Sequence, residues 1–145
     1  MIHTSAIFAH LRRVLHGAYF LQYLNMHELD QLVLGLRAMR VFKGFEIIRQ
    51  GDPGDAFYLI ATGRVSVWRK KGTNRVKVAE LRADEFFGEM SLLTNEPRNA
   101  TVMAEGVTEL FILEKYNFEK ILMKNPAIAE KIRKTNDARA EKNRW

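Results

Sequence analysis

One stretch of the chain, from Phe86 to Val102, carries the residue types that bind a phosphate and a sugar together; it reads FFGEMSLLTNEPRNATV. Gly88 has no side chain, so its backbone can approach a ligand closely. A short helix that begins after this glycine would point free N–H groups at an anion such as a phosphate. Arg98 can return to the same place and bind the anion with its fork of donors, whereas Glu89 only accepts hydrogen bonds and would pair with sugar hydroxyls. This combination indicates a nucleotide that carries a single phosphate.

The bare pattern has a second interpretation, in which a turn joins two strands and Glu89 and Arg98 merely pair on the surface. The ordered set of residues at this spacing favours binding, since a Gly-Glu or a Pro-Arg alone would not be specific. Residues 87–93 and 97–102 resemble the phosphate-binding cassette of cyclic-nucleotide-binding domains. This family includes the regulatory subunits of cAMP-dependent protein kinase, catabolite activator proteins and cyclic-nucleotide-gated channels. The whole stretch 41–113 is similar to the family in order and spacing.

The resemblance implies a set of ligand-binding residues. In the cassette they are Phe87, Gly88, Glu89, Met90, Ser91, Arg98, Asn99 and Ala100. Arg98 would bind the phosphate, and Glu89 would accept from the ribose 2′-hydroxyl. The backbone N–H groups of Gly88, Glu89 and Ser91 would face the phosphate and the ribose. The last helix would act as a lid, because Arg139 matches the position at which prokaryotic channel modules place an arginine over the purine.

Three positions depart from the usual pattern of the family. Asp84 stands where a glycine is common, and aspartate tolerates a left-handed turn. Ser91 stands where alanine is common; its backbone N–H should still serve, and its hydroxyl can add a bond. Asn99 directly follows the arginine, where a threonine resembles the cGMP-favouring members. The expected ligand is cAMP, with cGMP as the alternative, because preferences set by single polar contacts are modest.

Hydrophobic periodicity predicts helices at both ends of the chain. An apolar face at helical spacing covers residues 5–22, and Asn25 with Glu28 predicts a capping box at the start of a second helix. After the cassette, one helix is followed by Asn125 and Pro126, a favourable N-cap and first residue for the last helix. This last helix becomes highly polar in its outer half.

Between these helices, short alternating segments separated by turn residues predict about eight strands. Two of them would form a hairpin at residues 41–49, and glycines such as Gly54 would serve the turns first. This spacing favours a mainly β fold with flanking helices: an eight-stranded β-roll or jelly roll with an N-terminal helical pair and two C-terminal helices. The expected single domain, residues 1–145, has N-terminal helices at 1–38, a β-roll at 39–114 that holds the cassette at 86–102, and C-terminal helices with the lid at 115–145.

Composition narrows the classes of function. The 145 residues are 47% apolar and 28% charged, with no cysteine and no apolar run near the ~20 residues that a membrane span needs. The sequence therefore predicts no membrane span and a cytoplasmic location. The net charge of +6 comes from basic residues that alternate with acidic ones, so nucleic acid is not an expected partner.

An enzyme is the alternative from another class. Jelly rolls also host metal-dependent enzymes, which need histidines that project into the barrel. All four histidines precede the strands, so a histidine-built metal site in the barrel is excluded. No paired carboxylates indicate acid–base catalysis. The sequence thus predicts neither catalytic nor metal-binding residues.

The expected function is a regulatory sensor in signal transduction, whose flanking helices move when a cyclic nucleotide binds. The helical pair before the roll looks most similar to the cytosolic module of prokaryotic cyclic-nucleotide-gated channels and to kinase regulatory subunits. The tail after the last helix is too short for the helix-turn-helix domain of catabolite activators. The chain is therefore either complete or the sensor half of a transcription regulator or channel, and its effector domain or partner stays open.

Overall fold

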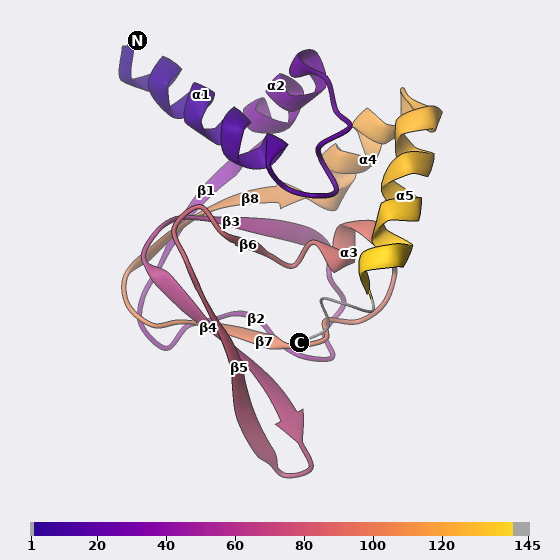
Figure 1. The fold of residues 1–145 in the computed structure, drawn as a ribbon. Helices are drawn as coiled ribbons and strands as arrows, with labels where there is room; N and C mark the ends of the chain where they lie inside the picture. The colour runs from indigo at the N-terminus through magenta and orange to yellow at the C-terminus, as the bar shows by residue number, and fades with distance from the viewer. Residues whose placement is uncertain (1, 141–145) are drawn as a thin grey trace.

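The structure is a computed structural model that describes residues 2–140. In this part of the chain, eight strands form two four-stranded antiparallel sheets, with helices before and after them (Figure 1). This confirms the predicted mainly β roll with flanking helices. The strands are β1 Arg37–Val41, β2 Glu46–Ile48, β3 Ala56–Thr62, β4 Arg64–Lys71, β5 Asn74–Arg82, β6 Phe86–Phe87, β7 Thr101–Ala104 and β8 Thr108–Glu114. The helices are α1 Ile2–His16, α2 Met26–Leu34, α3 Met90–Leu93, α4 Lys115–Met123 and α5 Pro126–Ala140.

The chain passes repeatedly from one sheet to the other, and the strand orders are β1-β8-β3-β6 and β2-β7-β4-β5. The predicted hairpin at residues 41–49 is wrong, because β1 pairs with β8 in one sheet and β2 pairs with β7 in the other. The turn at Gly44, which has a φ of +90°, carries the chain between the sheets. The Gly44 N–H donates to Ala104 O at 2.8 Å, so this turn is tied to β7 rather than to β1.

The N-terminal helical pair is present, but its first helix is shorter than predicted. α1 stops at His16, and turns lead from there to Asn25. Gly17 follows the helix, and glycine disfavours a helix interior. Phe20 is fully buried within these turns (0% exposed), so its apolar character reflects core packing and not a helix face. The predicted capping box is confirmed, since Asn25 Oδ1 accepts from Glu28 N–H at 2.8 Å and Glu28 Oε1 accepts from Asn25 N–H at 2.9 Å.

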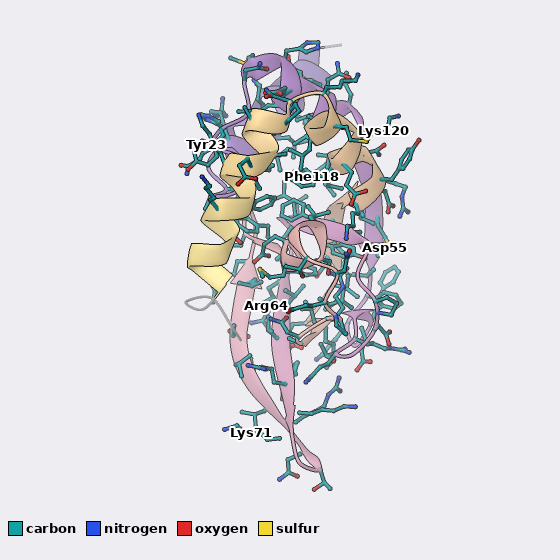
Figure 2. All side chains as sticks on the ribbon, turned by 90° about the vertical axis from the view of Figure 1, so that its right-hand side faces the viewer. Tyr23, Asp55, Arg64, Lys71, Phe118 and Lys120 are labelled. Carbon is teal, nitrogen blue, oxygen red and sulfur yellow. The ribbon has the colours of Figure 1, made fainter. Side chains whose placement is uncertain are left out.

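The apolar core has two parts that meet at the cassette. One part fills the roll and includes Phe87. The other lies between the first sheet and the helices, where Phe20 packs edge-on against Phe57 and against Phe118, which Figure 2 labels. Leu92 of α3 belongs to this second part. The short segment from β6 to α3 is therefore packed against both parts of the core.

The last helix, α5, lies alongside the cassette. Asn125 caps it as predicted, because Asn125 Oδ1 accepts from Ile128 N–H at 3.4 Å, and Pro126 is its first residue. Ile132 is 1% exposed and packs in the same part of the core as Leu92. Figure 1 shows α5 running from the layer of helices past α3 toward the second sheet. α5 thus packs beside α3, with Ile132 and Leu92 in the same part of the core.

Candidate functional site

The cassette begins on a tight strand pair. Phe87 of β6 pairs with Tyr58 of β3, and their rings stack with centroids 5.1 Å apart and planes 8° apart. The chain then turns at Gly88, whose φ of +81° lies in the left-handed region that glycine adopts without strain. A Cβ at Gly88 would lie 2.8 Å from Arg98 Nη1 and 3.2 Å from Ala56 O. Both the backbone conformation and the crowding therefore require glycine here.

Arg98 reaches back into the cassette and is held by both its backbone and its side chain. Its backbone N–H donates to Asp52 O at 2.8 Å, in the turn before β3. The residue is only 7% exposed. Nη1 donates to Gly88 O at 3.1 Å and to Ser91 Oγ at 2.6 Å. Nη2 donates to Ala56 O at 2.9 Å, so the guanidinium is fixed from two sides.

Arg98 has no counter-ion in the part of the chain that the structure describes, because none of the ion pairs found there involves it. Burial lowers the pKa of its guanidinium, and interactions with Tyr58, Asp55 and Glu89 oppose that shift. Of the five N–H donors that an arginine carries, three are used here, which leaves two for a ligand. A buried charge without a partner favours an anionic ligand.

Glu89 is a second buried charge in the cassette. It is 8% exposed, and within the described residues its carboxylate accepts no hydrogen bond from another residue. Burial raises the pKa of this carboxyl, while its own backbone N–H and the positive charge of Arg98 oppose the shift. A carboxylate only accepts hydrogen bonds, so the group that satisfies it must be a donor such as a hydroxyl. The cassette therefore offers both an anion site, at Arg98, and a hydroxyl site, at Glu89.

The structure brings the predicted cassette residues together between β6 and the start of β7. They are Phe87, Gly88, Glu89, Met90, Ser91, Arg98, Asn99 and Ala100. Met90 and Asn99 are partly exposed, whereas Ala100 is fully buried in the roll (0%). Arg139 lies in α5, but its side chain is outside the part of the chain that the structure describes.

Both the backbone and the side chain of Ser91 form hydrogen bonds within the cassette. The sequence predicts that its backbone N–H faces the phosphate, but this N–H donates to Gly88 O at 3.2 Å within the cassette. The single turn of α3 thus closes on the carbonyl before it, and the role of this N–H toward a phosphate stays a prediction. The Ser91 hydroxyl, instead, accepts from Arg98. Asp84, the other departure that affects the backbone, has a φ of +71°, as expected for an aspartate in a left-handed turn.

Three residues that surround the Arg98 side chain are absent from the predicted set: Gly54, Ala56 and Tyr58. A Cβ at Gly54 would lie 2.8 Å from Arg98 Nε and would overlap the Ser91 side chain. Ala56 supplies the carbonyl for Nη2, and the Tyr58 ring centroid lies 5.9 Å from Arg98 Cζ. The glycine before β3 was the available signal, but its residue type alone does not distinguish a turn from a close contact.

Arg98 also borders a polar cavity of about 240 Å³ next to β2. Charged residues line it, among them Glu46, Arg49, Asp52 and Asp55. Arg49 Nε lies 3.1 Å from Glu46 Oε1, and the Arg49 side chain is 69% exposed. Arg49 is therefore a matched comparison for Arg98, since it lines the same cavity but is solvated and ion-paired.

Two other functional features are absent from the described residues. No group of three or more histidine, aspartate or glutamate side chains there could hold a metal ion, and the sequence has no cysteine. No helix of the described chain combines the length and the apolar character that crossing a membrane requires. The cassette with Arg98 and Glu89 is the site that the buried charges single out.

Comparison with known proteins relates this cassette to a family. Residues 39–125 match the family model of the cyclic nucleotide-binding domain. The chain is 37% identical over 106 residues to a cAMP-dependent protein kinase regulatory subunit of Dictyostelium discoideum, which covers 70% of this chain and 32% of that protein. It is 41% identical over 107 residues to a cyclic nucleotide-gated potassium channel of Mesorhizobium japonicum, with 74% of this chain and 28% of that protein covered.

Solved structures give a similar result. The cAMP-bound PfPKA-R structure matches with a TM-score of 0.74 and 31% sequence identity, over 79% of this chain and 41% of that chain. The chain spans about a third or less of the length of the curated relatives that it matches.

Proposed function

The chain belongs to the cyclic nucleotide-binding domain family, and from this premise we propose that it is a regulatory sensor for cAMP. The observation that carries the proposal is the pair of buried charges in the cassette, Arg98 and Glu89, neither of which has an ion-pair partner in the described residues. A cyclic nucleotide offers a phosphate anion to the first and a ribose hydroxyl to the second. One ligand would thus satisfy both groups.

Each cassette residue has a role in this proposal. Arg98 binds the phosphate with its two remaining donors, and Glu89 accepts from the ribose 2′-hydroxyl. The backbone at Gly88 allows the sugar to approach, because no side chain stands there. The other predicted positions would line the ligand through backbone or apolar contacts; they are Phe87, Met90, Ser91, Asn99 and Ala100. The stacked rings of Phe87 and Tyr58 support the cassette where it leaves β6.

The base preference is the first prediction. In competition with a fluorescent cyclic nucleotide, cAMP is expected to displace the probe at lower concentration than cGMP. Asn99 follows the arginine, and the threonine that resembles cGMP-favouring members is absent. The similarity to cAMP-dependent kinase subunits and to a cAMP-bound structure supports the same choice. The difference should be modest, since one polar contact decides it.

The matched variant for this experiment is Asn99→Thr, which is expected to shift the preference toward cGMP. Tighter binding of cGMP by the wild-type chain would reverse the assignment and make the protein a cGMP-preferring sensor.

We also propose that α5 is the lid that reports binding. Leu92 of the cassette, Ile132 of α5 and Phe20 of the N-terminal turns belong to one part of the core. A close-packed core changes between discrete packings, so a shift of the cassette would alter the packing both at the N-terminal turns and at α5. Lys131 Nζ lies 5.9 Å from the centroid of the Tyr23 ring, which Figure 2 labels beside α5. This contact places α5 next to the N-terminal turns as well.

Hydrogen exchange with and without cAMP tests the lid. Amides from Ile132 to Ala140 are expected to gain protection on binding, because Arg139 would then stack on the purine and hold the second half of the helix. Amides of β4, whose Val67 is fully buried (0%) in the other part of the core, serve as the internal reference. Arg139→Ala should weaken binding less than Arg98→Ala does. Equal exchange of the α5 amides in both states would refute the lid and move the switch to the N-terminal helices.

The kinds of protein among the relatives support a proposal for the output of the sensor. Regulatory subunits and channels are among them, so we propose a regulatory and non-catalytic role, with cyclic nucleotide as the ligand and an effector domain or partner protein of either kind. The module would act in the cytoplasm, which the absence of cysteines suits. Nucleic acid is not a proposed partner.

A further inference from the structure

Among the cassette side chains that the structure describes, that of Ser91 is the one that bonds directly to Arg98. It is 3% exposed, and its hydroxyl oxygen accepts from Arg98 Nη1 at 2.6 Å. The other acceptors of the guanidinium, Gly88 O and Ala56 O, are backbone carbonyls. The hydroxyl is therefore the part of this arrangement that depends on a choice of side chain.

The surrounding structure leaves room for this hydroxyl and for little else. Gly54 faces it, and a Cβ at Gly54 would overlap both Oγ and Cβ of Ser91. The same Cβ would come within 2.8 Å of Arg98 Nε. The backbone N–H of Ser91 donates to Gly88 O, the carbonyl that also accepts from Arg98 Nη1, so one local network joins the three residues. Such networks orient a charged group more than single bonds do.

The donor count shows what this orientation leaves free. Nη1 donates both of its hydrogens, to Gly88 O and to Ser91 Oγ, and Nη2 donates one to Ala56 O. The hydrogens that remain are one on Nη2 and one on Nε, the number that a bidentate anion takes. We propose that the Ser91 hydroxyl is a positioning group, which holds the guanidinium of Arg98 with this pair of donors ready before the phosphate arrives. The inference rests on the proposed function, since the anion is the phosphate of the cyclic nucleotide.

The first test needs no ligand. In nitrogen-labelled protein, NMR of the arginine side chains measures rotation about the Nε–Cζ bond. In the wild type, the Arg98 signals are expected to show slow rotation, and Ser91→Ala should make it faster because one anchor of Nη1 is gone. Ser66→Ala is the control, since Ser66 is also fully buried (0%) but bonds Glu105 and Trp68 instead. Unchanged rotation in Ser91→Ala would refute the anchor.

The second test is binding. Ser91→Ala is expected to weaken cAMP binding about 3- to 10-fold, the range of one hydrogen bond, while Ser66→Ala leaves it unchanged. In an Arg98→Lys background, Ser91→Ala should have no further effect, because no fork remains to be oriented. Equal affinity of the wild type and Ser91→Ala would overturn the positioning role. If the wild type bound no cyclic nucleotide, the proposed function would be wrong. The NMR experiment would still test whether Ser91 anchors the Arg98 guanidinium, because it needs no ligand.

Discussion

Replacing Arg98 with alanine is expected to cost about 2–5 kcal/mol of cyclic nucleotide binding, the usual range when one side of a buried charged pair is truncated. The side chain is 7% exposed and has no counter-ion in the described residues, so the ligand phosphate would be its partner. In the variant, the phosphate would enter a desolvated site with no charge to meet it. The affinity of Arg98→Lys should lie between those of the wild type and Arg98→Ala, because lysine keeps the charge but lacks the fork of donors.

Titration calorimetry with cAMP measures this loss directly. Arg49→Ala is the control, since Arg49 lines the same cavity but is 69% exposed and ion-paired with Glu46, and it should bind as the wild type does. Circular dichroism and a thermal melt establish that the variants are folded. A folded Arg98→Ala variant with near wild-type affinity would show that the phosphate binds elsewhere.

Replacing Glu89 with alanine is expected to cost about 1.5–3 kcal/mol of cAMP binding, the range of a hydrogen bond to a charged group. The loss should be specific for the ribose. A cyclic nucleotide that lacks the 2′-hydroxyl should bind the wild type more weakly than cAMP does, and it should bind the wild type and Glu89→Ala almost equally. If the substitution weakened both ligands alike, Glu89 would act on the fold or the phosphate and not on the ribose.

The Glu89 carboxyl is also expected to change the stability of the unliganded protein with pH. Its folded pKa is raised above the ordinary value of 4.5, mainly by burial, so the folded state binds more protons than the unfolded state between these two values. Stability therefore falls as pH rises through that window. Glu89→Gln removes this loss, so the unliganded variant should melt at a higher temperature than the wild type at neutral pH. Below pH 4.5 the difference should vanish. If Glu89→Gln is more stable yet binds cAMP more weakly, its loss of binding does not come from a loss of folding.

The cassette could be predicted from the sequence because it is local. Gly88 and Glu89 come directly before the turn of α3, and Arg98 returns to the same segment. The capping box of Asn25 and Glu28 is local for the same reason. Where residue type and short spacing decide the geometry, no knowledge of the rest of the fold is needed.

Features that depend on distant parts of the chain could not be predicted. The segment 41–49 has the alternation and turn of a hairpin, but its strands pair with β8 and β7 instead, and local pattern does not state the partner. The predicted helix over residues 5–22 extends too far, because residues 17–22 form turns in which Phe20 is fully buried, and a packed turn and a helix face bury the same residue types. Gly54 reads as a turn former, and only the arrival of Ser91 and Arg98 from the cassette makes it a contact point.

We propose that the cassette binds a cyclic nucleotide through its phosphate and ribose. Calorimetric titration of the wild-type chain with cAMP, with adenosine as the comparison, tests it most directly. We expect one cAMP to bind per chain and adenosine to bind much more weakly, because adenosine has the ribose and the base but no phosphate for Arg98. A folded protein that binds neither cAMP nor cGMP, or that binds adenosine as tightly as cAMP, would contradict it.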